Sequence, residues 1–233
     1  MNSITAVVLC GGVGSRLKSV VKDIPKPLAE VNGVPFLDIL LRWIEKSKSI
    51  TSIVLAAGHL GHLIESRYLP MNNSRVPIKT IVETEKLGTG GAIFNSLREI
   101  NTEHFVVLNG DSFINVDLDK ILSQHCNRGA DVTFSVKYLS NTSRYGRVIL
   151  SEKSKKIIGF MEKSDNQEAG YINCGLYIFK TKFVLKNFNE GSFSLEDWFE
   201  TNIKKYNVEY FTTKSDFIDM GTPASYHEIQ SFF

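Results

Sequence analysis

A glycine-rich segment near the amino terminus has the composition of a phosphate-binding turn. Residues 9–17 read LCGGVGSRL and continue an apolar run that extends from Ile4 to Cys10. Glycines at the carboxyl end of a buried strand let backbone N–H groups approach a phosphate closely. The spacing fits neither a dinucleotide fingerprint, because Leu17 stands where a third small residue belongs, nor a Walker loop. Taken alone, the segment could equally be an ordinary tight turn.

Two cationic residues strengthen the phosphate interpretation. Arg16 lies in the loop itself, and Lys26 stands between Pro25 and Pro27. Prolines restrict φ and stiffen the stretch that carries the lysine. Two fixed positive charges beside a backbone anion site suit a triphosphate whose phosphorus is attacked. Arg16 and Lys26 are therefore candidate catalytic residues, and the alternative is a pair of solvated surface charges.

A second glycine cluster reads LGTGGA over residues 87–92, ahead of a predicted helix that runs to about Arg98. Thr89 is placed to act as the N-cap of that helix. Glycines in a first turn cost about 1 kcal/mol each relative to alanine, so something is expected to need close backbone approach. A nucleobase or a ribose lying on the turn would meet that need.

Two aspartates follow short apolar runs that resemble strands. Asp111 ends the sequence VVLNGD, and Asp219 lies in FIDMG. Mg²⁺ is usually bound by one or two carboxylates together with substrate phosphates and water. Each aspartate could instead cap a helix. Beside a phosphate loop, the two together predict a magnesium site.

The combined motifs resemble those of the sugar-1-phosphate nucleotidyltransferase family. The matching segments are residues 9–17, 25–27, 87–92, 109–111, 162–163, 173–175 and 219–223. Ser15 departs from the family's commoner threonine but keeps the hydroxyl group. The resemblance implies that an oxygen of a sugar 1-phosphate attacks the α-phosphorus of a nucleoside triphosphate in line and releases pyrophosphate.

The same resemblance assigns roles to individual residues. Arg16 and Lys26 would stabilise the phosphate charge in the transition state, and Asp111 and Asp219 would hold Mg²⁺. The nucleotide-binding residues implied are Leu9, Gly11, Gly12, Gly14, Ser15, Glu83, Gly88, Thr89, Asn109 and Asp111. The sugar-phosphate-binding residues implied are Tyr145, Gly146, Glu162, Lys163 and Asn173.

Glu83 bears on the choice of nucleotide. Relatives that use uridine or thymidine triphosphates typically carry glutamine at this position, five residues before Gly88. A carboxylate has no donor, but guanine presents N1–H and the 2-amino group side by side, and an ionised carboxylate accepts from both. We therefore predict GTP, with a Glu83 that merely ends a strand and meets solvent as the alternative.

Within the family, the sequence looks most like the D-glycero-α-D-manno-heptose 1-phosphate guanylyltransferases, chiefly over residues 18–27, 83–92 and 192–196. Mannose-1-phosphate guanylyltransferase is the nearest alternative, because mannose has the same ring configuration. Glucose-1-phosphate uridylyltransferase or thymidylyltransferase is more distant. An alternative of another class, a non-catalytic regulatory subunit that binds sugar nucleotides, is disfavoured because the charged phosphate and metal residues are all present.

The elements that must position these residues follow from the apolar runs. Runs at 4–10, 53–57 and 105–108 alternate with helix-like stretches such as 35–44. This order predicts right-handed βαβ crossovers and a Rossmann-like α/β fold with a mostly parallel central sheet and helices on both faces. Runs at 132–136, 147–150, 157–161 and 171–179 have fewer helices between them. They predict an antiparallel extension that carries the sugar-binding residues.

Composition limits the remaining possibilities. The chain has 233 residues, 42% of them hydrophobic, and a net charge of +2, which offers no broad field for nucleic acid. We expect residues 1–233 to form a single nucleotidyltransferase catalytic domain that ends shortly after the last motif. Three widely spaced cysteines favour a cytoplasmic location. The sequence contains no run of eighteen apolar residues, so we predict no membrane span. The sequence leaves a homodimer open.

Overall fold

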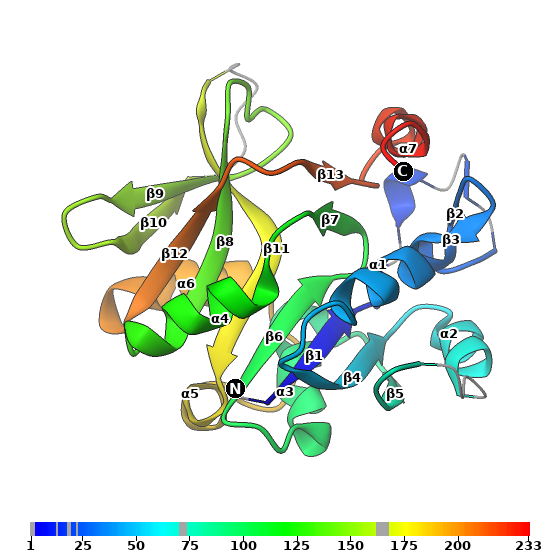
Figure 1. Cartoon of the computed structure of the whole chain (residues 1–233), viewed down its shortest axis with the longest axis horizontal. Coiled ribbons are helices and arrows are strands. Elements are labelled where there is room, and N and C mark those ends of the chain that lie inside the picture. The colour runs from blue at the N-terminus through cyan, green and yellow to red at the C-terminus, as the bar shows by residue number, and fades with distance from the viewer. Residues whose placement is uncertain (1–2, 13, 18–19, 22, 70–73, 162–167) are drawn as a thin grey trace.

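The structure, a computed structural model, describes residues 3–12, 14–17, 20–21, 23–69, 74–161 and 168–233 (Figure 1). Its main feature is a nine-stranded sheet with the order β5-β4-β1-β6-β11-β8-β12-β10-β9. The strands of this sheet are β1 (Ile4–Leu9), β4 (Ile50–Ala57), β5 (Ile78–Val82), β6 (His104–Asn109), β8 (Val132–Leu139), β9 (Arg147–Ser151), β10 (Lys156–Met161), β11 (Gly170–Lys180) and β12 (Val208–Thr213).

Helices and two small hairpins complete the described part of the chain. The helices are α1 (Phe36–Ile44), α2 (Gly61–Tyr68), α3 (Gly88–Ser96), α4 (Leu118–Asn127), α5 (Thr181–Asn187), α6 (Leu195–Asn202) and α7 (Pro223–Gln230). Short 3₁₀ turns are η1 (Ser15–Leu17), η2 (Lys26–Leu28), η3 (Leu97–Glu99) and η4 (Ile203–Lys205). The small strand pairs are β2 (Glu30–Val31) with β3 (Val34–Pro35), and β7 (Ser112–Ile114) with β13 (Phe217–Asp219).

The sheet is mixed, which corrects the expectation of a mostly parallel sheet. Strands β5, β4, β1 and β6 run parallel to one another, as the sequence predicted for the first half. Strand β11 then runs antiparallel to both β6 and β8, while β12 returns parallel to β8. In the second half, β9 and β10 are joined by a four-residue turn and no crossover helix, which permits only antiparallel pairing of these two strands.

The antiparallel extension closes on itself. Strand β9 pairs with β10 on one side and with β11 on the other, while β10 also pairs with β12. Strands β11, β8, β12, β10 and β9 therefore form a ring beside the parallel half of the sheet. The predicted extension is confirmed, with closure as an added feature.

Helices cover both faces of the sheet, as predicted. Along β1, Ala6 and Val8 point into one hydrophobic core and Val7 points into the other, because successive strand residues face opposite sides. The first core packs against α1, α2 and α4, and the second against α3, α5 and α6. The helices on the two faces hold the parallel strands in place, with the carboxyl ends of these strands at one edge of the sheet.

Two predicted details of the helices had different outcomes. Helix α1 matches the predicted stretch 35–44, with Pro35 directly before it and buried Leu37, Leu40 and Ile44 on one side. Thr89 is not the N-cap of α3, because the helix begins at Gly88 and Leu87 holds the cap position. The Thr89 hydroxyl instead accepts a hydrogen bond from the backbone N–H of Leu195 at 2.8 Å.

No helix within the described ranges is long and apolar enough to cross a lipid bilayer.

A buried pair of histidines lies far from the phosphate loop, between β6, α4 and β8. His104 Nδ1 lies 3.1 Å from His125 Nε2, and His125 Nδ1 lies 2.8 Å from the Thr133 hydroxyl. Desolvation and the neighbouring His104 lower the pKa of His125 to about 3. The folded protein therefore holds His125 neutral at pH values where an unfolded chain would protonate it.

This burial predicts a pH-dependent stability. A histidine whose pKa is lowered by folding takes up its proton only on unfolding, so stability falls as pH drops below about 6.5. His125 alone should lower the free energy of unfolding by about 1.4 kcal/mol between pH 7.5 and 5.5. Urea titrations at the two pH values measure the difference. In His125→Gln the fall should shrink by about that amount, and an equally steep fall would contradict a neutral, buried His125.

Candidate active site

The active-site candidates converge where four neighbouring parallel strands end. Glu83 follows β5, Gly58 follows β4, Gly11 follows β1 and Asp111 follows β6. Ligands of open α/β sheets bind at this edge, beyond the carboxyl ends of the strands. The sheet order thus brings together residues that lie up to a hundred positions apart.

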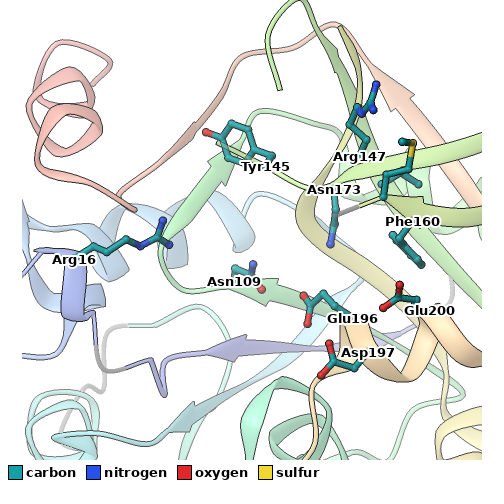
Figure 2. A pocket seen from close by; sticks show the side chains of 12 residues that line it. Arg16, Asn109, Tyr145, Arg147, Phe160, Asn173, Glu196, Asp197 and Glu200 are labelled. Carbon is teal, nitrogen blue, oxygen red and sulfur yellow. The ribbon is translucent and has the colours of Figure 1, made fainter. Parts of the chain in front are cut away.

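The loop predicted to bind phosphate leaves β1 and, at Gly14, lies against the lysine-bearing turn. Gly14 has a φ of +61°, a conformation that favours glycine, and a side chain there would lie 3.5 Å from Lys26 Cβ. The backbone N–H of Leu17 donates to the Gly14 carbonyl at 2.8 Å, which starts the 3₁₀ turn η1. Arg16 in this turn is exposed and its guanidinium reaches the cavity (Figure 2).

Lys26 and Asp111 form an ion pair at the centre of the site. The Lys26 side chain is only 11% exposed, so the alternative of a solvated surface charge is wrong for this residue. Asp111 is held by a turn in which the Gly110 N–H donates to the Leu9 carbonyl at 2.9 Å. A side chain at Gly110 would approach that carbonyl to 2.7 Å, which explains the glycine.

Asp219 lies beside Asp111 because β13 pairs with β7. Asp219 is opposite Ser112 in the register, and the Met220 N–H donates to the Asp111 carbonyl at 2.8 Å. The Asp219 carboxylate accepts from Arg144 at 2.8 Å and from the Tyr145 hydroxyl. Burial and this hydrogen bond raise the pKa of Tyr145 well above its usual range.

Neither aspartate caps a helix in the described part of the chain. Asp117 caps α4 by accepting from the Lys120 N–H at 3.1 Å, and Thr222 caps α7 by accepting from the Ser225 N–H at 3.2 Å. The helix-cap alternative for Asp111 and Asp219 is therefore wrong.

The two aspartates line a small cavity of about 140 Å³ together with positively charged side chains. Its walls include Arg16, Lys26, Asn109, Arg144 and Asn173. Carboxylate oxygens are the ligands that Mg²⁺ prefers, and both carboxylates here already contact a cation. The two carboxylates are a donor set that would suit a magnesium ion, with substrate phosphates and water as its further oxygen ligands.

A larger cavity of about 460 Å³ adjoins the small one and shares Arg16, Asn109, Tyr145 and Asn173 with it (Figure 2). Gly146 also lines it. The Asn173 side chain is fixed, because its Nδ2 donates to the Tyr177 hydroxyl at 2.6 Å and its Oδ1 accepts from the Gly175 N–H at 3.0 Å. The predicted sugar-site residues Glu162 and Lys163 lie outside the described residues.

The wall of this cavity opposite Arg16 consists of residues that were not predicted from the sequence. Helix α6 contributes three carboxylates there, and β9 contributes Arg147 (Figure 2). The acidic residues are Glu196, Asp197 and Glu200. In the sequence, their spacing shows that the three carboxylates lie within about one helical turn. The sequence does not show that α6 packs against α3, the contact that brings these carboxylates to the cavity.

Glu83 packs against the glycines of two neighbouring loops. Side chains added at Gly11 or Gly58 would lie 3.5 Å and 3.0 Å from its carboxylate oxygens. Its backbone N–H donates to the Ala57 carbonyl at 2.8 Å. Partial burial raises the pKa of Glu83. Glu83 therefore belongs to the same strand-end edge as the phosphate loop.

The second glycine cluster packs against the protein's own chain. Side chains at Gly88 and Gly90 would collide with the backbone and the ring of Phe193, and one at Gly91 would collide with the Gly191 carbonyl. The close approach inferred from sequence is thus real, but the neighbour is the segment that leads into α6. These glycines need no ligand to explain them.

Comparisons with known proteins agree with this geometry. The Nucleotidyl transferase family model matches residues 5–233. D-glycero-alpha-D-manno-heptose 1-phosphate guanylyltransferase from Campylobacter jejuni is 35% identical over 95% of this chain and 96% of its own. The protein of the same name from Aneurinibacillus thermoaerophilus is 36% identical over 97% of this chain and 96% of its own.

The chain is also similar to solved structures over its full length. The crystal structure of HddC from Yersinia pseudotuberculosis matches with a TM-score of 0.85 and 31% identity, covering 100% of both chains. HddC complexed with GMP-PN matches with a TM-score of 0.84 and 32% identity, again over 100% of both chains.

The chain belongs to the nucleotidyl transferase family and is a nucleotidyltransferase enzyme. The family resemblance stated from the motifs is confirmed.

The two glycine clusters should respond differently to alanine. Gly91→Ala gains about 1 kcal/mol of helix propensity but drives a methyl group into the Gly191 backbone, so we expect a net loss of about 1–3 kcal/mol of stability. A methyl group at Gly12 would meet no atom of the described residues within 4 Å, so Gly12→Ala should stay within about 0.5 kcal/mol of wild type.

Denaturant unfolding measures the stability of both variants relative to wild type, and steady-state kinetics measure their KM for nucleotide. Gly12→Ala should raise the KM if the first loop receives a phosphate. Equal stability of Gly91→Ala and wild type would show that the Gly191 contact does not constrain the cluster.

Proposed function

We propose that this enzyme transfers a guanylyl group from GTP to D-glycero-α-D-manno-heptose 1-phosphate, giving the GDP-sugar and pyrophosphate. The observation that carries the guanine assignment is Glu83, a carboxylate set against Gly11 and Gly58 at the nucleotide-binding edge. A carboxylate there suits the paired N–H donors of guanine and lacks a donor for a pyrimidine. The relatives named for heptose transfer support the sugar, and GMP-PN, bound by HddC, is a guanine nucleotide.

The reaction needs alignment and charge stabilisation more than proton transfer. An ionised phosphate oxygen of the sugar 1-phosphate forms a bond to the α-phosphorus while the bond to pyrophosphate breaks on the opposite side. Arg16 and Lys26, which both line the small cavity, would stabilise the negative charge that shifts to the leaving pyrophosphate. No covalent enzyme intermediate and no general base are required, because the attacking oxygen already carries charge.

Asp111 and Asp219 would hold Mg²⁺ at the small cavity. When bound, the ion neutralises phosphate charge and polarises the α-phosphoryl group. Lys26 would keep its place beside Asp111 and present its ammonium group to the same phosphates. The hydrogen bond from the Met220 N–H to the Asp111 carbonyl fixes the two carboxylate-bearing turns relative to each other, and the bond from the Gly110 N–H to the Leu9 carbonyl fixes the first turn to β1.

The larger cavity would receive the sugar. Tyr145, Gly146 and Asn173 line it, and hydroxyl and amide groups can both donate to and accept from sugar hydroxyls. Glu162 and Lys163 are proposed to complete the sugar-phosphate contacts, as the family resemblance implies. Arg16 lines both cavities, so its guanidinium would lie where nucleotide and sugar phosphate are proposed to meet.

A substrate panel tests the function directly. GTP, UTP, dTTP and ATP would each be combined, with Mg²⁺, with the 1-phosphates of the heptose, mannose and glucose, and pyrophosphate release would be followed. We expect the highest kcat/KM for GTP with the heptose phosphate. A preference for UTP would overturn the guanine assignment, and a preference for mannose 1-phosphate would overturn the heptose assignment.

Glu83→Gln tests the base contact by itself. Loss of the charged acceptor should lower the selectivity for GTP over UTP by about 1–3 kcal/mol, because one guanine N–H donor then faces an amide donor. The ratio of kcat/KM values for the two nucleotides gives this quantity. Glu152→Gln is the matched control, since Glu152 is exposed in the turn between β9 and β10. An unchanged ratio in Glu83→Gln would remove Glu83 from the base site.

A further inference from the structure

Asp219 has both carboxylate oxygens occupied by donors of its own chain. Oδ1 accepts from the Gly221 N–H at 2.5 Å and from Arg144 Nη2 at 3.0 Å. Oδ2 accepts from the same guanidinium nitrogen at 2.8 Å and from the Tyr145 hydroxyl. A carboxylate offers about four lone-pair positions, so these contacts fill them.

Asp111 is more accessible. Its side chain is 40% exposed, against 14% for Asp219. Within the described part of the chain, its carboxylate bonds only to Lys26, through Oδ2. A cation can therefore reach Asp111 at Oδ1, whereas it reaches Asp219 only after a donor leaves.

Arg144 is the donor best placed to leave. The Tyr145 hydroxyl and the Gly221 N–H are neutral, so they can keep orienting the carboxylate beside a metal ion. The guanidinium carries a full charge, and two cations on the same oxygens repel each other. The Arg144 side chain is 43% exposed in the loop between β8 and β9, so water can solvate the guanidinium when it leaves Asp219.

The guanidinium of Arg144 already lies beside other groups of the site. Its guanidinium carbon lies 5.3 Å from the centroid of the Tyr145 ring, and its side chain lines the small cavity that contains both aspartates. Release from Asp219 therefore leaves the guanidinium at the edge of the site, where anionic substrate groups enter.

We propose that Arg144 is an exchangeable counter-ion of Asp219, which it neutralises in the unloaded enzyme and releases when Mg²⁺ binds with the nucleotide. This inference rests on the proposed function, since it assumes a magnesium nucleotide at Asp111 and Asp219. Competition from Arg144 weakens the binding of free metal, so the metal binds tightly only when triphosphate oxygens add to the ligands. Arg144 is thus a positioning residue that couples metal binding to nucleotide binding.

Metal affinity, measured without turnover, tests the exchange. Mn²⁺ replaces Mg²⁺ as the probe, and free Mn²⁺ is titrated by electron paramagnetic resonance with the enzyme alone and with a non-hydrolysable GTP analogue. Arg144→Gln should bind Mn²⁺ about 3- to 10-fold more tightly in the enzyme alone, because the competing charge is gone. Arg144→Lys should restore most of the wild-type affinity, because it keeps the charge.

Arg128→Gln is the matched control. Arg128 also pairs with a carboxylate at 2.8 Å, that of Glu209, and is 37% exposed, but it lies in the turn after α4. Its replacement should leave Mn²⁺ affinity unchanged. Thermal unfolding midpoints show whether each variant is folded.

An Arg144→Gln variant with unchanged or weaker Mn²⁺ affinity would overturn the exchange. The same titration on Asp219→Asn separates this failure from failure of the metal site, since wild-type affinity there would show that Asp219 is not a ligand. Failure of the proposed function itself would appear in the pyrophosphate-release panel, independently of either titration.

Discussion

The whole site depends on four parallel strands that end side by side. Neighbouring strands lie about 4.8 Å apart, so β5, β4, β1 and β6 place their terminal residues along an edge of about 14 Å. Glu83 stands at one end of this edge and Asp111 at the other, with the Gly11 loop between them. In the proposed arrangement, a nucleotide laid along the edge would meet the base acceptor, the backbone anion site and the metal site in that order.

Charge is balanced in pairs before any substrate arrives. Lys26 neutralises Asp111, and Arg144 neutralises Asp219. Such pairing lets the fold hold two carboxylates near each other without strong mutual repulsion. It also keeps Lys26 beside the proposed position of the triphosphate, where electrostatic stabilisation of the transition state by this residue would need little reorganisation. The ring formed by β11, β8, β12, β10 and β9 adds the second cavity beside these charges.

Local signals allowed much of this arrangement to be predicted from the sequence. The apolar run from Ile4 and the glycines after it identify β1 and its loop, and Pro25 and Pro27 mark Lys26 as unusual. The antiparallel direction of β11 follows the prediction for the run 171–179, but its place between β6 and β8 was not predicted, because strand order depends on pairing between distant segments. Thr89 was misplaced as a cap, since its hydroxyl bonds to Leu195, 106 residues away. The carboxylates of α6 and the contact of Arg144 with Asp219 likewise arise only from tertiary packing.

A crystal structure of the enzyme with a non-hydrolysable GTP analogue and Mg²⁺ tests the strand-edge arrangement most directly. It should show the guanine N1–H and 2-amino group bonded to the Glu83 carboxylate, the triphosphate along the Gly11–Arg16 loop, and the metal ion between Asp111 and Asp219. A guanine bound away from Glu83, or a metal ion that contacts neither aspartate, would contradict it.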